Sequence, residues 1–188
     1  DPIPDSLGRV TILESVGHLR NNPRQYAGLF SAGYDAVKSV FPKAKVIVHL
    51  DNGFYQPLYD SNLDTLAKYG AKWDVVGMSL YPYWALDSGL ETDEEMVITH
   101  CIDNINHVWK KYHTPVMIVE TGFEVDEDHP EVMEKGRDQL RRIIRESRAT
   151  GHCLGIFYWE PECRPSRYRL GAFTSDGRPT VIMDGFRE

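Results

Sequence analysis

Residues 116–122 read Val-Met-Ile-Val-Glu-Thr-Gly, and this stretch decides the fold class of the chain. Four apolar residues in succession lead into Glu120, and a Thr-Gly pair follows at once. A run this short and this apolar predicts a parallel strand that is buried on both faces. A carboxylate at the C-terminal end of such a strand lies where (β/α)8 barrels carry their catalytic groups. Taken alone, the pattern also fits a glutamate that caps the next helix or is simply solvated.

The segments on either side of this strand alternate between helix-like and strand-like patterns. Helix starts are predicted at Asn22 and at the Thr92–Glu95 pair, which has capping-box spacing. Helix ends are predicted at Pro42, Gly70 and Gly151. Residues 1–20 are expected to be a loop, and the tail is expected to be a loop with one short terminal helix. The expected strands are 45–50, 74–80, 116–120 and 154–158, and the expected helices are 23–41, 57–69, 93–112, 131–149 and a piece within 164–188.

Strands that alternate with helices predict parallel βαβ units. A nucleotide-binding sheet would also carry ligands at its C-terminal edge, but no Gly-rich phosphate loop follows any of the strands. A complete barrel needs eight strands and about 250 residues. We therefore predict an α/β fold, the C-terminal half (strands 5–8) of a (β/α)8 TIM barrel, as a single partial domain over residues 1–188. Its open edges imply a first half-barrel, supplied from upstream or by another chain.

The composition is that of an ordinary soluble globular protein, with 188 residues, 41% hydrophobic and 26% charged. A net charge of −7 argues against a nucleic-acid partner held by phosphate contacts. No apolar run approaches the roughly 18 residues that cross a bilayer, so no membrane partner is expected. The chain opens with Asp1-Pro2 rather than Met, and we expect that this is not the start of the gene. Cys101, Cys153 and Cys163 lack metal-type spacing and are expected to be unpaired.

Polar and aromatic side chains gather at the C-terminal ends of the four expected strands. Aromatic faces stack on pyranose rings, polar side chains bond sugar hydroxyls, and paired carboxylates cleave glycosidic bonds. Plainer interpretations remain open: rim packing for the two tryptophans, a core histidine, and a tight turn at residues 51–53. The candidate residues are His49, Asp51 and Asn52; Tyr81, Tyr83 and Trp84; Glu120; and Trp159 and Glu160.

These strand ends occur in an order and at intervals that carry a family resemblance. The stretches are His49-Leu50-Asp51-Asn52-Gly53, Tyr81-Pro82-Tyr83-Trp84, Val119-Glu120-Thr121 and Tyr158-Trp159-Glu160-Pro161. Together they resemble the second half of the endo-β-1,4-galactanases, family 53 of the glycoside hydrolases. Residues 28–38, Gly-Leu-Phe-Ser-Ala-Gly-Tyr-Asp-Ala-Val-Lys, resemble that family's fourth barrel helix. The match runs from about residue 20 to 185.

The resemblance implies a retaining hydrolase of β-1,4-galactan in plant arabinogalactan or pectin, with Glu120 as nucleophile. It also implies a secreted, periplasmic or cell-surface protein of a bacterium. The family's acid/base glutamate lies in an Asn-Glu pair, which this chain lacks; Glu14 has the wrong neighbours. The acid/base would fall before Asp1, so the 188 residues alone are expected to be inactive. The residues implied to line the sugar subsites are Asp51, Asn52, Tyr81, Trp84 and Trp159, and Glu160 is expected to be structural or to contact substrate.

Two further features and two alternative functions complete the sequence-based expectations. The resemblance implies that calcium could bind in the loop holding Asp126–Asp128, as it does in some members of the family, but a solvated acidic loop is the favoured interpretation. No other cofactor and no metal site are expected. Arg164, Arg167 and Arg169 fit a salt-bridged loop better than a site for an anionic sugar. The alternative functions are a non-catalytic glycan-binding barrel and a barrel hydrolase of another β-1,4-glycan, such as mannan or cellulose.

Overall fold

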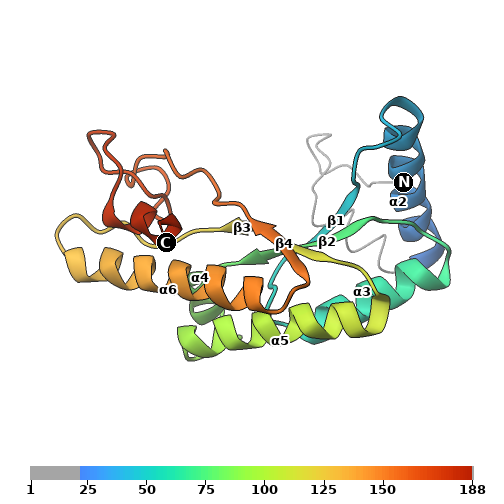
Figure 1. The fold of residues 1–188 in the computed structure, drawn as a ribbon, viewed down its shortest axis with the longest axis horizontal. Helices are drawn as coiled ribbons and strands as arrows, with labels where there is room; N and C mark the ends of the chain where they lie inside the picture. The colour runs from blue at the N-terminus through green and yellow to red at the C-terminus, as the bar shows by residue number, and fades with distance from the viewer. Residues whose placement is uncertain (1–21, 188) are drawn as a thin grey trace, which may run out of the picture. The chain divides into compact units, whose positions relative to one another are not determined.

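A computed structural model describes residues 22–187, and its centre is a four-stranded parallel sheet (Figure 1). Each strand pairs with the next one along the chain, so the spatial order is β1-β2-β3-β4. This confirms the predicted parallel α/β fold. The expected loop at residues 1–20 and Glu14 lie outside the described residues. The strands are β1 (Ile47–Leu50), β2 (Val75–Leu80), β3 (Val116–Thr121) and β4 (Cys153–Ile156).

The helices agree with the sequence prediction to within a few residues, with one addition. The addition is a short helix after β2, where Pro82 occupies the first helical position and its fixed φ suits a helix start. The sequence analysis treated this stretch only as a strand end. The helices are α2 (Pro23–Val40), α3 (Gln56–Lys68), α4 (Pro82–Asp87), α5 (Glu94–Tyr112), α6 (Pro130–Ala149) and the 3₁₀ helix η1 (Val181–Phe186).

The predicted helix boundaries rest on capping chemistry that the structure largely contains. The side chain of Asn22 accepts a hydrogen bond from the Gln25 amide at the start of α2. Gly70 and Gly151 adopt positive φ values of 75° and 70° after α3 and α6, a conformation that favours glycine. The start of α5 differs from the prediction. Asp93, and not Thr92, is the N-cap, because its carboxylate accepts from the Glu95 amide at 2.8 Å.

The chain divides by its contacts into two compact units, which are described separately. The smaller unit holds the described residues of 1–46 together with 59–74. Within it, the Tyr26 hydroxyl donates to the Asn62 side chain at 2.8 Å. Lys38 pairs with Asp74 at 2.8 Å, and the Asp74 carboxylate also accepts from the Val46 amide. The single partial domain predicted over residues 1–188 stays a prediction.

The larger unit comprises residues 47–58 and 75–188 and contains the whole sheet. Helices α5 and α6 lie side by side; α5 packs against β3 and α6 against β4 (Figure 1). The 3₁₀ helix η1 packs along α6. Strand β2 is buried along its full length, whereas β3, which the sequence predicts to be buried on both faces, alternates between buried and half-buried residues because one face lines the open side of the sheet. The largest fully buried side chains on β2, β3, α5 and α6 are Met78, Leu80, Ile98, Ile105, Ile118, Leu140 and Ile143.

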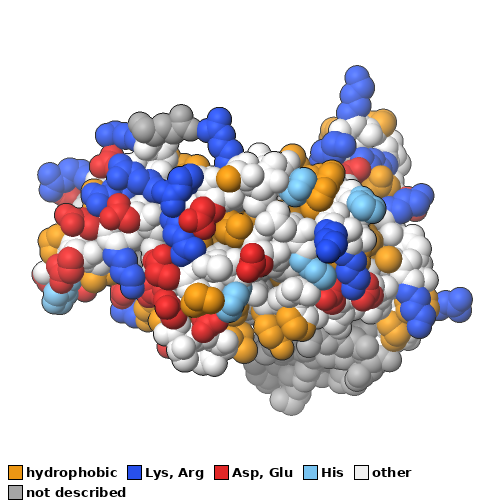
Figure 2. Space-filling view, turned by 60° about the horizontal axis from the view of Figure 1, so that its bottom comes forward, with side chains coloured by type: hydrophobic (Ala, Val, Ile, Leu, Met, Phe, Trp, Pro, Cys, Tyr) orange, Lys and Arg blue, Asp and Glu red, His pale blue; other side chains and the backbone are white. Residues whose placement is uncertain are grey.

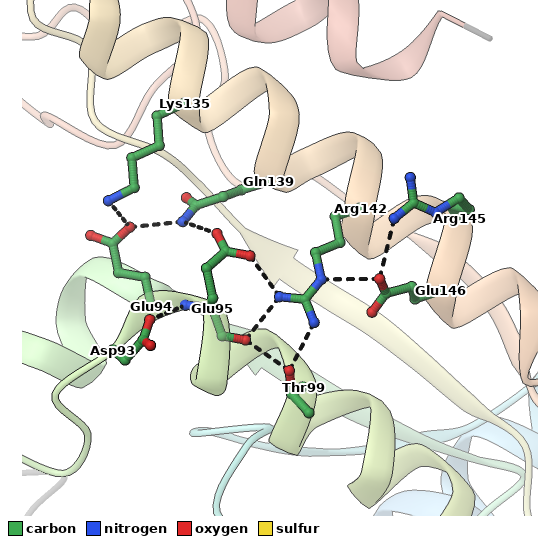
Figure 3. A network of polar contacts seen from close by, with 9 residues as sticks. All are labelled: Asp93, Glu94, Glu95, Thr99, Lys135, Gln139, Arg142, Arg145 and Glu146. Atoms are coloured by element: carbon green, nitrogen blue, oxygen red, sulfur yellow. Dashed lines mark hydrogen bonds and ion pairs between the residues drawn. The ribbon is translucent and has the colours of Figure 1, made fainter.

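A polar network joins α5 to α6 across their exposed side (Figure 3). Arg142 is its centre, with donors to the Glu95 carbonyl at 2.9 Å, the Thr99 hydroxyl at 2.8 Å and the Glu146 carboxylate at 3.0 Å. Lys135 adds an ion pair to Glu94 at 2.6 Å. Figure 2 shows acidic and basic side chains interspersed over much of this face. A mixed charge pattern of this kind is that of a solvated helical surface.

Two expectations about chemistry outside the site can also be compared with the structure. Cys101, Cys153 and Cys163 are unpaired, which confirms the prediction. Cys101 is buried, and burial raises the pKa of its thiol well above the ordinary value. Over residues 22–187, no helix combines the length and the apolar character that crossing a bilayer requires.

Candidate active site

The C-terminal ends of β1, β2 and β3 enclose a pocket of about 360 Å³. Six of the nine residues predicted from the sequence line it, which brings together side chains from three strand ends and the helix that follows β2. Ser79 is a further lining residue that the sequence analysis did not single out. The residues around the pocket are His49, Asp51, Asn52, Ser79, Tyr81, Trp84 and Glu120.

A bulge in β3 aims Glu120 at this pocket. Met78 pairs with Ile118, but the next residue of β2, Ser79, pairs with Glu120, so Val119 is an extra residue in β3. Side chains alternate between the two faces of a strand, and Ile118 is fully buried. Without the extra residue, Glu120 would share the buried face of Ile118. The bulge places it instead on the face that carries Ser79, as bulges beside active sites commonly do.

Two hydroxyl groups from β2 and its end hold one oxygen of the Glu120 carboxylate. Ser79 Oγ donates to Glu120 Oε2 at 3.2 Å, and the Tyr81 hydroxyl donates to the same oxygen at 3.3 Å. The other oxygen, Oε1, lies 4.0 Å from His49 Nε2. The two carboxylate oxygens therefore have different surroundings, and Oε2 is the anchored one.

His49 reaches Glu120 through Ser79. The distance between His49 Nε2 and Ser79 Oγ is 2.7 Å. Because the single hydroxyl proton of Ser79 is donated to Glu120, its oxygen must accept from His49, which assigns the imidazole proton to Nε2. The sequence analysis left open a hydrogen-bonded core histidine for His49. The structure gives it a hydrogen bond and a place in the pocket at once.

Tyr81 stays protonated beside the carboxylate over the range in which most proteins function. Burial raises the pKa of its phenol far above the ordinary value of about 10, and the nearby Tyr168 and Glu120 raise this pKa further. The hydroxyl is therefore a hydrogen-bond donor to Glu120 at any pH below that of ordinary tyrosine titration. The O–H dipole of Tyr81 therefore points at Glu120 Oε2 over this whole pH range.

The Asp51-Asn52-Gly53 segment is both a tight turn and part of the pocket wall. The Asp51 carboxylate accepts from the Asn52 amide at 2.7 Å, and Asn52 has a positive φ of 48°. The Gly53 amide donates to the Ser79 carbonyl at 2.7 Å, and Asn104 from α5 donates to the Gly53 carbonyl at 2.7 Å. A Cβ on Gly53 would lie only 3.0 Å from that Ser79 carbonyl. The turn is thus fixed to both the sheet and α5.

The aromatic residues predicted at the site separate into two groups. Trp84 lines the pocket and is 40% exposed. Tyr83 does not line it: its hydroxyl accepts a hydrogen bond from Arg169, whose guanidinium lies 5.3 Å from the Tyr83 ring centre. Arg169 also pairs with Glu124 at 3.5 Å, in agreement with the predicted salt-bridged loop.

Trp159 and Glu160 likewise lie outside the residues that line the pocket. The Trp159 amide donates to the Thr121 carbonyl at 2.9 Å, which continues the pairing of β4 with β3 beyond the strand proper. Its side chain is 44% exposed, and Glu160 is exposed with a positive φ of 41°. Their predicted contact with substrate stays a prediction.

In the acidic loop after β3, the Asp126 carboxylate is hydrogen-bonded to other residues of the same loop. Asp126 accepts from the amides of Asp128 and His129 at 3.0 and 3.2 Å and from the His129 ring at 2.9 Å. The His129 hydrogen bond is the main cause of the lowered pKa of Asp126. Among residues 22–187, no three His, Cys, Asp or Glu side chains are grouped to hold a metal. Calcium binding here stays a prediction.

Comparison with known proteins identifies a family that the chain matches over most of its length. Residues 9–180 match the sequence profile of glycosyl hydrolase family 53. An uncharacterised protein from the bgaB 5′ region of Niallia circulans is 27% identical over 166 residues, 76% of this chain and 42% of that protein. The probable arabinogalactan endo-β-1,4-galactanase A of Neosartorya fischeri is 27% identical over 161 residues, 74% of this chain and 43% of that protein.

Solved structures show the same fold. One, from a study of two fungal β-1,4-galactanases, superposes with a TM-score of 0.72 at 18% identity, covering 89% of this chain and 55% of the other. The family 53 catalytic domain of Ignisphaera aggregans gives 0.69 at 23% identity, covering 89% and 52%. The chain thus spans about half the length of the relatives it matches. Its four strands are part of a barrel.

Proposed function

This chain belongs to glycosyl hydrolase family 53, and we propose from that membership that it carries the nucleophile half of a retaining endo-β-1,4-galactanase. The observation that carries the proposal is the Glu120 carboxylate, which the β3 bulge turns into the pocket and which two hydroxyls hold by one oxygen. The names of the fungal relatives support β-1,4-galactan as the substrate.

In the proposed reaction, Glu120 Oε1 attacks the anomeric carbon and forms a glycosyl-enzyme ester, while the leaving oxygen takes a proton from an acid. Water then hydrolyses the ester. Ser79 and Tyr81 keep the carboxylate from rotating, because both donate to Oε2, so Oε1 is the oxygen presented to the sugar. Trp84 would stack on the apolar face of a sugar ring, and Asp51, Asn52 and His49 would bond its hydroxyls.

The acid must come from outside the described residues. A retaining enzyme needs two carboxyl groups about 5–5.5 Å apart. In the described part of the chain, Asp51 is the other carboxylate that lines the pocket, and its side chain already stabilises the turn at Asn52. We infer that a preceding half-barrel supplies the acid, and that the 188 residues alone do not cleave galactan.

Exposed apolar side chains on the outer strands support a preceding half-barrel. Ile47 on β1 is 37% exposed, and Leu154 and Phe157 on or beside β4 are 61% and 57% exposed. Across the described residues, β1 and β4 each pair with one strand only. Four further strands would pair with both edges and cover these side chains.

The test uses the complete barrel, with this chain joined to its preceding half. Glu120→Ala and Glu120→Gln should each abolish galactan cleavage while binding of galacto-oligosaccharides remains measurable, because neither side chain can form the ester. A 2-deoxy-2-fluoro galactoside should label the parent protein covalently, and mass spectrometry should locate the label on Glu120. Cleavage by the Gln variant at the parent's rate would refute the nucleophile. Binding without any cleavage by the parent would favour the glycan-binding alternative.

Location follows from the proposed substrate. A galactan polymer does not cross a membrane, so an endo-acting enzyme must meet it outside the cytoplasm. We therefore propose that the protein is secreted, periplasmic or attached to the cell surface of a bacterium. Immunodetection in cell fractions tests this directly, and recovery in the cytoplasm alone would contradict it.

A further inference from the structure

A buried asparagine on α5 contacts the turn that forms one wall of the pocket, although it does not line the pocket itself. The side chain of Asn104 is 1% exposed, and its Nδ2 donates to the Gly53 carbonyl at 2.7 Å. Among residues 22–187, its Oδ1 has no partner. Burial of an amide is unfavourable unless the amide is hydrogen-bonded, so the bond to Gly53 is what offsets the burial of this side chain.

Gly53 is fixed between β2 and α5 by its own backbone groups. Its amide donates to the Ser79 carbonyl at 2.7 Å, and its carbonyl accepts from Asn104. A Cβ added to Gly53 would lie 3.0 Å from that Ser79 carbonyl and 3.2 Å from Cys101 Sγ on α5. The glycine therefore contacts the strand on one side and the helix on the other, and Asn104 makes its hydrogen bond on the helix side.

The residue before Gly53 has a backbone conformation that its surroundings must maintain. Asn52 has a φ of 48°, in the left-handed region that is unfavourable for residues with a side chain. Its carbonyl accepts from the Tyr55 amide at 2.7 Å, and its amide donates to the Asp51 carboxylate at 2.7 Å. Asp51 and Asn52 line the pocket and directly precede Gly53. A hydrogen bond to the Gly53 carbonyl therefore acts on both of them through the short turn.

Glu120 is held by contacts outside this turn. Its Oε2 accepts from the side chains of Ser79 and Tyr81, and Ser79 lies in β2 opposite Glu120 in β3. The pairing of these two strands does not depend on the Gly53 carbonyl. Loss of the Asn104 hydrogen bond should therefore displace the turn and leave the carboxylate of Glu120 in place.

We propose that Asn104 is a positioning residue: through the Gly53 carbonyl it holds Asp51 and Asn52 where they bond sugar hydroxyls. It thereby sets the affinity for the glycan and not the rate of attack by Glu120. The sugar-binding part of this inference rests on the proposed function, whereas the anchoring of the turn does not. Preorganised side chains bind more tightly, because less ordering is required when the ligand arrives.

The first experiment measures the anchoring of the turn without any activity. Hydrogen–deuterium exchange is followed by mass spectrometry in the complete barrel, with and without Asn104→Leu, which removes the donor at similar volume. Backbone amides of residues 52–55 should exchange about tenfold faster in the variant, while those of β3 should not change. Asn106→Leu, at an exposed asparagine of the same helix, is the matched control and should leave both unchanged. Unchanged exchange at residues 52–55 in folded Asn104→Leu overturns the inference.

The second experiment separates KM from kcat in the complete barrel. Asn104→Leu should raise KM for galactan by roughly five- to tenfold and keep kcat within about twofold, the pattern expected when ground-state and transition-state binding weaken equally. Ile105→Ala, at a fully buried residue of α5, is the control for loosened packing; it should lower stability and leave KM unchanged. An equal rise of KM in Ile105→Ala, or a change of Asn104→Leu confined to kcat, would overturn the role of Asn104.

A second variant covers the case in which Asn104→Leu does not fold. Asn104→Ala also lacks the donor and adds no bulk, so it must give the same faster exchange and the same rise in KM. Parent-like values of both quantities in Asn104→Ala would overturn the inference in the same way.

Asp51→Ala distinguishes failure of this inference from failure of the proposed function. If Asp51→Ala raises KM while the Asn104 variants change neither KM nor exchange, Asn104 has no positioning role and the proposed sugar-binding turn stands. If Asp51→Ala leaves KM unchanged while exchange responds to Asn104→Leu, the turn is anchored as inferred but the proposed sugar-binding role is wrong. Retained activity of Glu120→Gln would refute the nucleophile and leave the exchange result unaffected.

Discussion

Among single residues, Ser79 contributes most to the geometry of the site. It is a small polar residue in a strand that is otherwise apolar and fully buried. Its hydroxyl accepts from His49 at 2.7 Å and donates to Glu120 at 3.2 Å, so one group orients two pocket residues. A hydroxyl that bridges a histidine and a carboxylate sets both the imidazole tautomer and the carboxylate rotamer.

We expect Ser79→Ala to lower kcat of the complete barrel by about tenfold, the effect of removing one oriented hydrogen bond from the proposed nucleophile. Nitrogen NMR of His49 should also report a loss of the Nε2–H tautomer preference, since Nε2 no longer has this acceptor. Ser39→Ala, at an exposed serine on α2, is the matched control for both measurements. Parent-like kcat and an unchanged tautomer in Ser79→Ala would contradict this role.

The free space around two glycines gives a second prediction for single residues. A Cβ at Gly122 would lie 2.5 Å from the Leu170 carbonyl, whereas Gly33 on α2 has no atom within 4 Å. Gly122→Ala should therefore lower the free energy of unfolding by about 1–3 kcal/mol through overpacking. Gly33→Ala should raise it by about 0.5–1 kcal/mol, because alanine favours a helix interior. Urea denaturation of both variants checks the contrast, which equal effects would refute.

At the scale of elements, the α5–α6 pair is stabilised by polar contacts as well as by its apolar core. Arg142 is 22% exposed and bonds three residues of α5 and α6, whereas Arg145 is 72% exposed and contacts only Glu146 among the contacts drawn (Figure 3). A planar guanidinium with several well-placed partners contributes more than an exposed ion pair does.

We expect Arg142→Ala to lower the free energy of unfolding by about 1–3 kcal/mol, and Arg145→Ala to leave it unchanged within error. The Arg142 hydrogen bond is the main cause of the lowered pKa of Glu146. A lowered folded-state pKa contributes stability above the unfolded value of about 4.3, and this part is lost as the pH falls through the folded value. The difference between parent and Arg142→Ala should thus shrink below about pH 4. Urea titrations at pH 7 and pH 3 measure it, and a constant difference would contradict the assignment.

At the scale of the whole molecule, the chain corresponds to about half of a barrel and holds one of the two proposed catalytic carboxyl groups. The chain covers 42% and 43% of two relatives and 55% and 52% of two solved structures. The pocket it forms contains the proposed nucleophile and the residues proposed to bind sugar, and the acid is proposed to lie in the other half. Closure of the sheet and completion of the active site would therefore be one event.

The isolated 188-residue chain should show no galactanase activity above background, and co-expression with the preceding half-barrel should restore it. Co-expression with the Glu120→Gln variant should not restore galactanase activity. This variant is the matched control, because it should still assemble with the other half but lacks the proposed nucleophile. Size-exclusion chromatography of the mixture should show a complex of one copy of each half. Strong cleavage by the isolated chain would exclude a missing acid.

The sequence by itself determined the order and type of nearly all elements, and it located Glu120 at a strand end, because hydrophobic periodicity and helix caps act over a few neighbouring residues. Only the tertiary structure decided what surrounds Glu120. Val119 becomes a bulge because of its pairing with β2, and Tyr83 turns to Arg169 while Trp84 turns to the pocket. Ser79 carries no chemical signal in the sequence, since a lone hydroxyl acquires a role only from neighbours that folding brings within hydrogen-bond distance.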